Sequence, residues 1–263
     1  MDALDRMAER LHAEGRPRVW SLIVTAFGDV AAPRRAPLSA ARLAALMEPA
    51  GIGGGAVRTA LSRLVADGLL VRSQTARAGL HAPSPALAAE IAAATPLIYD
   101  APSRGWEVSV GPRPPRALPL APSVWLSREP SDGAGARFAA QPIEAPDLAD
   151  GQALDPAHLS ASRRLDADLD DLSRSPGDPL RSATARLLLV HRWRRLVLRW
   201  PEVPDGWLPR GQAAPRPRVE RALTALRAPS ERWWDEAIGP GPAGAPVRRE
   251  APAPQAIRGT GPR

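Results

Sequence analysis

The segment from Ser39 to Ala82 limits the possible folds of this chain more than any other segment does. Residues 39–47 carry apolar side chains at helical spacing, and Ser39 stands where it can cap the first turn. A glycine-containing turn follows, and residues 56–66 repeat the helical pattern up to Gly68, which is typical of a helix end. A short apolar strand, a turn and a return strand then reach Ala82. This order predicts a winged helix-turn-helix, whose second helix is shaped to enter the DNA major groove.

The second helix of this segment has one apolar and one polar side. At about 100° per residue, its apolar positions fall together on one flank: Ala60, Leu61, Leu64 and Val65. The opposite side carries arginine and hydroxyl groups but no carboxylate: Arg58, Thr59, Ser62 and Arg63. Arginine binds a guanine edge or a phosphate, and Ser and Thr bond to either. Periodicity alone is equally compatible with a solvated amphipathic helix, and the strands that follow favour DNA recognition.

The strands after this helix predict a wing from Leu69 to about Ala82, with Arg72 and Arg77 on or near it. A wing lies along the DNA backbone or enters the minor groove, where the negative potential favours arginine. The predicted double-stranded DNA contacts are therefore the outward side chains of the helix and the wing: Arg58, Thr59, Ser62, Arg63, Arg72 and Arg77.

The charge balance agrees with a polyanionic partner. Between residues 16 and 90, nine arginines oppose four carboxylates, a surplus of five positive charges, and the whole chain carries +7. All 35 basic residues are arginine, and alanine and proline abound, as in proteins of GC-rich genomes. Part of the arginine surplus is therefore compositional bias, and the charge is weaker evidence than the pattern of side chains.

Several classes of site find no support in the sequence. Because the chain has no cysteine, it has no disulfide, no thiolate metal site and no cysteine nucleophile. We find no phosphate loop, no G-x-S-x-G and no paired carboxylates at catalytic spacing, so we expect no enzyme, no catalytic residue and no cofactor. The absence of a signal peptide and of an apolar run of about 18–20 residues predicts a cytoplasmic protein without a membrane segment.

The middle of the chain predicts short strands followed by an acidic region. Residues 106–110 and 123–127 are strand-like, 138–143 is a candidate third strand, and 144–171 is acidic. Within it, alternate aspartates resemble the start of a calcium loop: Asp166, Asp168 and Asp170. The glycine and distal glutamate of such a loop are missing, so a solvated helix face or an acidic linker is favoured and no metal is predicted.

The C-terminal third predicts helices and a tail. Apolar residues recur at helical spacing from Pro179 to Trp200, and arginines at 192, 195 and 199 form a stripe beside them. The stripe fits a solvated face or contacts to ligand phosphates. A last helix is expected at about 218–227 and a disordered tail over 240–263, and the tryptophans are expected to fill a core.

Several segments in the same order resemble PaaX-type transcriptional regulators. These are residues 21–30, 57–68, Ile98-Tyr99, Trp106, Ser123-Val-Trp and Leu189-Val-His-Arg-Trp-Arg-Arg-Leu. The resemblance implies an α+β multidomain protein with a winged helix-turn-helix, a ferredoxin-like α/β middle domain and a C-terminal helical domain. It also implies a homodimer that represses a phenylacetate-type catabolic operon and is released by an aryl-acyl-CoA effector. The matched C-terminal residues are assigned to effector or dimer contact: His191, Arg192 and Arg195.

The domain boundaries follow from these patterns. We expect an N-terminal extension (1–16), the winged helix-turn-helix (17–97), the middle domain (98–172), the helical domain (173–239) and the tail (240–263). The middle domain is expected to be reduced, because residues 110–123 are too short and proline-rich for the first helix of a ferredoxin-like unit.

Two other functions stay open at this point. A winged helix also serves as a protein-interaction module without sequence-specific DNA binding, since a fold does not fix a function. A metal-dependent nuclease is the third hypothesis, because the family's middle domain is related to a small CRISPR-associated nuclease and this chain has a cluster of aspartates.

Overall fold

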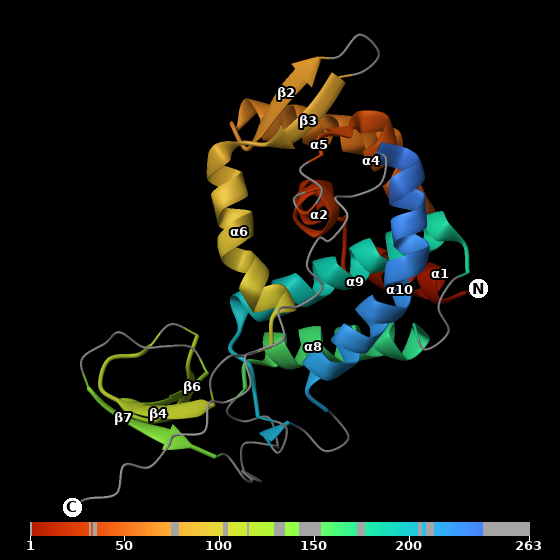
Figure 1. Cartoon of the computed structure of the whole chain (residues 1–263). Helices are drawn as coiled ribbons and strands as arrows, with labels where there is room; N and C mark the ends of the chain where they lie inside the picture. The colour runs from red at the N-terminus through yellow and green to blue at the C-terminus, as the bar shows by residue number, and fades with distance from the viewer. Residues whose placement is uncertain are drawn as a thin grey trace, which may run out of the picture.

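A mixed helix-and-sheet fold, with N-terminal helices, two small antiparallel sheets and C-terminal helices, agrees with the expected class in its coarse form (Figure 1). Three parts of the sequence analysis lie outside the residues that the structure describes. They are Arg77, most of the acidic stretch before residue 154, and the expected tail. The computed structural model describes residues 2–31, 33, 36–74, 79–101, 105–114, 116–128, 135–141, 154–172, 177–204, 207–208 and 213–238.

The N-terminal part is built from helices and short helical turns. They are α1 (Ala3–Ala13), α2 (Val19–Ala26), the π-helical turn η1 (Phe27–Ala31), α4 (Ala40–Met47), the 3-10 turn η2 (Glu48–Ala50) and α5 (Gly54–Ala66). Helix α1 occupies the segment expected as an extension, and Asp2 and Asp5 form a capping box at its start. The predicted cap of α4 is confirmed, because the Ser39 hydroxyl accepts a hydrogen bond from the Arg42 backbone N–H.

The first sheet contains the pair of strands expected after α5 and one short strand before α4. It has the order β1-β3-β2 and consists of β1 (Leu38–Ser39), β2 (Leu70–Gln74) and β3 (Gly79–Pro83), all antiparallel. Gly68, at φ +70°, ends α5 in the left-handed conformation that the sequence predicts for a helix end. Helix α6 (Pro85–Tyr99) starts after Ser84, whose hydroxyl accepts a hydrogen bond from the Leu87 N–H.

The second sheet differs from the expectation in two ways. It consists of β4 (Trp106–Val110), β5 (Leu118–Ala121), β6 (Val124–Ser127) and β7 (Ala136–Ala140), in the antiparallel order β5-β6-β4-β7. Strand β5 was not predicted, and β7 begins before the expected third strand and ends before residue 143. Within the residues described between β4 and β7 there is no helix, which agrees with the expectation that residues 110–123 are too short for the first helix of a ferredoxin-like unit.

The C-terminal part consists of three helices: α8 (Pro156–Asp171), α9 (Pro179–Arg199) and α10 (Pro215–Ile238). Helix α8 stands where the sequence favoured an acidic linker or a solvated face. Helix α10 is longer than predicted at both ends and includes Trp233 and Trp234. These two side chains and Trp193 are buried, so the expectation that tryptophans fill the core is confirmed for these three, whereas Trp200 is only partly buried.

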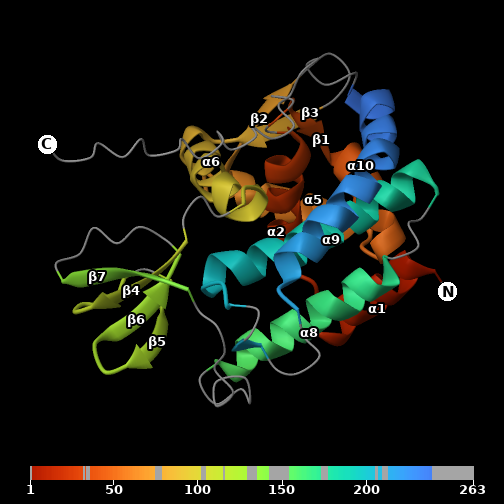
Figure 2. The same ribbon diagram turned by 60° about the horizontal axis from the view of Figure 1, so that its bottom comes forward.

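The helices before and after the second sheet share one hydrophobic core. Its buried side chains come from α1, α2, α4 and α5 as well as from α8, α9 and α10. Helix α1 lies beside α8 (Figure 2), and α2 lies between α5 and α9 (Figure 1). The second sheet lies at one end of the molecule with a separate, smaller cluster around Leu118, Leu126 and Leu154. The segments before β4 and after β7 therefore fold together.

The aspartates of α8 are partners of arginines rather than a calcium loop. Asp168 accepts from Arg10 and Arg192, and Asp166 and Asp170 both pair with Arg218. The favoured solvated-face interpretation is thus wrong for Asp168, whose side chain is 1% exposed. No group of metal-binding side chains and no helix able to cross a membrane is found among the residues that the structure describes.

Candidate nucleic-acid interface

The positions of α4 and α5 are set by their apolar sides. Leu43, Leu46 and Met47 of α4 are buried, as are the inward residues of α5: Val57, Ala60, Leu61 and Leu64. Gly54, in the first turn of α5, would bring an added Cβ to 3.5 Å from the Cβ of Ala44. This is an ordinary contact distance, so α4 and the start of α5 lie side by side, and the periodicity predicted from the sequence agrees with the burial of their apolar sides.

The outward side of α5 carries the four side chains that the sequence singles out. Arg58, Thr59, Ser62 and Arg63 are all exposed. The Thr59 hydroxyl donates to the Gly55 carbonyl at 3.0 Å, and the Arg58 guanidinium lies over Gly54. No carboxylate interrupts this group of side chains on the helix, because the only acidic neighbour, Asp67, lies beyond its last turn.

The start of α5 is open as well as polar. Its N-cap is Gly53, which provides no side-chain hydrogen bond to the first turn. The first N–H groups of a helix lack partners within the helix and attract anions, phosphate above all. An unobstructed helix start next to Arg58 is therefore compatible with contact to a nucleic-acid backbone.

The first sheet places a second basic group near this helix. Arg72 of β2 is exposed and lies opposite His81 of β3, whose side chain is buried. Burial, ahead of the charge of Arg72, lowers the pKa of His81. His81 is therefore a packed side chain of the sheet, and the exposed side chain of Arg72 lies on the same face of the sheet, with its guanidinium over Gly79. The other predicted wing residue, Arg77, lies outside the described residues.

The three predicted contact residues of α9 have different surroundings. His191 is 4% exposed, and its Nδ1 lies 3.2 Å from the Thr25 hydroxyl of α2. Burial, followed by the charges of neighbouring arginines, lowers the pKa of His191 to about 3, so the ring is neutral. Arg192 pairs with Asp168 and Glu14 and connects α9 to α8 and α1. Of the three, only Arg195 is exposed.

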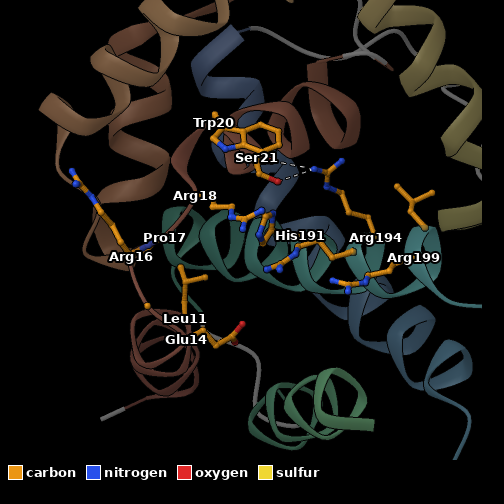
Figure 3. A pocket seen from close by; sticks show the side chains of 13 residues that line it. Leu11, Glu14, Arg16, Pro17, Arg18, Trp20, Ser21, His191, Arg194 and Arg199 are labelled. Atoms are coloured by element: carbon orange, nitrogen blue, oxygen red, sulfur yellow. Dashed lines mark hydrogen bonds between the residues drawn. The ribbon is translucent and has the colours of Figure 1, made fainter. Parts of the chain in front are cut away.

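Arg195 lines a cavity of about 390 Å³ that the sequence did not reveal. The cavity lies between the end of α1, the start of α2 and one side of α9 (Figure 3). Five arginines line it: Arg16, Arg18, Arg194, Arg195 and Arg199. Arg195 and Arg199 belong to the arginine stripe expected from the sequence. The local sequence pattern does not indicate that this stripe lies close to residues 16–21.

Comparison with known proteins identifies one segment. Residues 18–84 match the family described as PaaX-like protein, a range that includes α2, α4, α5 and the first sheet. No curated protein matches the chain. One similar solved structure is the uncharacterized protein Rv0674 from Mycobacterium tuberculosis, which is 22% identical with a TM-score of 0.44. The match covers 78% of this chain and 97% of that one.

The family match bears directly on the interface described above. PaaX-like proteins are regulators rather than enzymes, and the family implies DNA binding. The resemblance drawn from the sequence is thereby confirmed for the segment that holds α4 and α5. Residues 18–84 are similar to the PaaX-like family, and this similarity suggests a role of the transcription-regulator type.

Proposed function

We propose that this protein is a transcriptional regulator that binds double-stranded DNA through the outward side of α5. The observation that carries the proposal is the exposed set Arg58, Thr59, Ser62 and Arg63, on a helix whose other side is fixed in the core. Arginine reads guanine in the major groove, and hydroxyl groups bond to bases or phosphates. The family implication of DNA binding supports the same surface.

We infer that α4, α5 and the first sheet act together as a winged helix-turn-helix. In this arrangement α5 enters the major groove and the open start of α5 faces a phosphate. Arg72 and Arg77 would contact the backbone or the minor groove from the strands β2 and β3 and their connection. The support is the order of the elements, the exposure of Arg72 and the glycine cap of α5.

The proposed domains are those expected from the sequence, with the second sheet as a reduced ferredoxin-like unit. In chain order its strands are arranged 2-3-1-4 and are all antiparallel. A ferredoxin-like β-α-β-β-α-β unit has the same strand order. We therefore keep residues 17–97, 98–172 and 173–239 as the proposed units, although the first and third share a core.

The proposed regulator is a homodimer and a repressor of a catabolic operon, released by an aryl-acyl-CoA effector. The dimer is supported by the general geometry of such regulators, in which two recognition helices read two half-sites about one helical turn apart. His191 contacts Thr25, and Arg192 forms ion pairs with Glu14 and Asp168. We therefore propose the exposed Arg195 as the main effector contact of the three.

A binding titration with paired variants tests the assignment of α5. Arg63→Ala is expected to weaken binding to a duplex selected by the wild-type protein by about 1–3 kcal/mol, if Arg63 contacts a base edge. If it contacts a phosphate, the salt dependence of binding falls by about one counterion instead. Arg163→Ala is the matched control, because Arg163 is an exposed arginine on α8.

The outcome also separates DNA binding from the protein-interaction alternative. Unchanged affinity and unchanged salt dependence in both Arg58→Ala and Arg63→Ala would contradict the assignment. A wild-type protein that binds no duplex, or binds one independently of salt, would instead favour a protein-interaction module.

A further inference from the structure

The turn between α4 and α5 is rich in glycine. Four of the five residues from 51 to 55 are glycine, and Ile52 carries the only side chain among them. Glycine loses more conformational freedom on folding than any other residue. The local chain therefore does little to fix the direction in which α5 leaves the turn, and contacts from outside the turn contribute more to it.

Backbone hydrogen bonds fix the first half of the turn. Gly51, at φ +74°, adopts the left-handed conformation, and its N–H donates to the Glu48 carbonyl at 2.8 Å. The N–H of the buried Ile52 donates to the Met47 carbonyl at 3.2 Å. The second half lacks one common restraint, because the N-cap of α5 is Gly53, which provides no side-chain hydrogen bond to the first turn of the helix.

A side chain of α1 contacts this turn from outside. The Nε2 atom of His12 lies 2.9 Å from the carbonyl oxygen of Ala50, the last residue of η2. Because a carbonyl oxygen only accepts, Nε2 carries the hydrogen and donates it. The same atom lies only 3.1 Å from the position of an added Cβ at Gly51, so the ring also occupies the side of this glycine. His12 therefore restrains two successive residues of the turn.

Helix α1 is held in place independently of the turn. Its residues Leu4, Met7 and Leu11 are buried in the shared hydrophobic core. Helix α1 lies beside α8 (Figure 2), and Arg10 of α1 pairs with Asp168 of α8 at 2.7 Å. The C-terminal helices therefore determine where the end of α1 lies, and through it where His12 meets the turn.

We propose that His12 is a positioning residue for DNA binding, which holds the glycine-rich turn so that α5 presents its outward side in one orientation. His12 precedes residues 18–84, the segment similar to PaaX-like proteins, so α1 acts together with α4 and α5 from outside that segment. A turn that is ordered before DNA arrives lowers the entropy lost on binding. The role in DNA recognition rests on the proposed function, whereas the restraint of the turn does not.

Hydrogen exchange of the full chain without DNA tests the restraint. In His12→Ala the backbone amides of residues 51–57 are expected to exchange about tenfold faster, while those in the middle of α9 keep the wild-type rate. His12→Gln places an N–H donor at about the reach of Nε2 and should restore most of the protection, whereas the shorter His12→Asn should behave like His12→Ala. Glu9→Gln, at an exposed position of the same helix, is the control and should change neither region.

Three results would overturn the restraint. The first is exchange of residues 51–57 at the wild-type rate in His12→Ala. The second is an equal acceleration in the turn and in α9, which would show that His12 contributes only to global stability. The third is a failure of His12→Gln to restore protection, which would contradict the assignment to the hydrogen bond of Nε2.

A titration with the duplex selected by the wild-type protein tests the role in DNA recognition. His12→Ala is expected to weaken binding about three- to tenfold, and His12→Gln to bind close to the wild-type affinity. The salt dependence should be the same in all three proteins, because His12 contacts the turn and not a phosphate. Unchanged affinity in His12→Ala, or a reduced salt dependence, would overturn the positioning role. A wild-type protein that binds no duplex, with the expected exchange result, would refute the proposed function and leave the restraint in place.

Discussion

Asp168 is the residue at which the charges of three helices meet. Its carboxylate lies 2.7 Å from Arg10 Nε of α1 and 2.5 Å from Arg192 Nε of α9, and its side chain is 1% exposed. Burial raises the pKa of this carboxyl although two guanidiniums oppose the change. Such a group stabilises the fold only while all of its partners are present.

Removal of this charge is expected to be costly. Asp168→Asn should lower the free energy of unfolding by about 3–5 kcal/mol, because two arginines lose a shared buried partner. Asp170→Asn is the control: its side chain is 73% exposed, and loss of its pair with Arg218 should cost less than about 1 kcal/mol. Urea unfolding measures both variants, and equal losses would refute a special role for Asp168.

His191 predicts how stability depends on pH. Its pKa is about 3 in the folded chain and about 6.5 when unfolded. Between these values the unfolded chain binds a proton that the folded chain does not, so stability falls as the pH falls below about 6.5. The loss from this group is about 2 kcal/mol at pH 5.

The variant His191→Gln should make the stability less dependent on pH in this window. Some dependence remains, because burial also lowers the pKa of His158, to about 4. Urea unfolding at pH 7, 6 and 5 provides the comparison. The same pH dependence in His191→Gln and in the wild-type protein would show that His191 is not the group that titrates.

At the residue scale, the sequence predicted correctly which side chains of α5 point outward. It did not predict which residues form ion pairs with one another. The outward group on α5 and the cap at Ser39 depend on local spacing, and the structure bears them out. The partners of Arg192 are 24 and 178 positions away, and periodicity carries no information about such contacts.

At the scale of elements, α4 is fixed to α9 by a buried hydroxyl. The Thr184 hydroxyl donates to the carbonyl of Leu46 in α4 at 2.8 Å, and it also lies 3.0 Å from the Leu180 carbonyl of its own helix. Thr184 is fully buried. The bond connects the C-terminal helices directly to the helix that precedes α5.

Loss of this hydroxyl tests the connection. Thr184→Val keeps the shape of the side chain and is expected to cost about 1–2 kcal/mol of stability, because the Leu46 carbonyl loses a buried donor. Thr224→Val on α10 is the control, since the Thr224 hydroxyl bonds only to Glu220 of its own helix at an exposed site. Thermal unfolding of both variants gives the comparison, and a larger shift for Thr224→Val would contradict this contribution.

Elements were predicted where the local pattern was strong and missed where distant contacts create them. The pattern of α4 and α5 was sufficient to place them. Strand β5 was missed because Pro119 interrupts it, which is tolerated at the edge of a sheet. Helix α8 is acidic, and its charges are balanced by arginines of α1, α9 and α10, which lie far away in the sequence.

At the scale of the whole molecule, the segment similar to PaaX-like proteins is joined to the C-terminal helices. Asp29 in η1 accepts hydrogen bonds from Tyr99 of α6 and from Arg186 of α9, at 2.7 Å each. Together with the shared hydrophobic core, these hydrogen bonds hold residues 18–84 and α9 packed against each other. The proposed domain boundaries separate these elements along the chain, because the local sequence pattern carries no information about which helices pack together.

Selection from a random double-stranded DNA library, at moderate salt and followed by sequencing, tests the central claim most directly. A dimeric regulator that reads bases through α5 is expected to enrich a short inverted repeat with half-sites about one helical turn apart. The enrichment should disappear in Arg58→Ala/Arg63→Ala and persist in Arg163→Ala. Enrichment without any shared motif, lost as salt increases, would show that the arginines only attract phosphate and would contradict sequence-specific regulation.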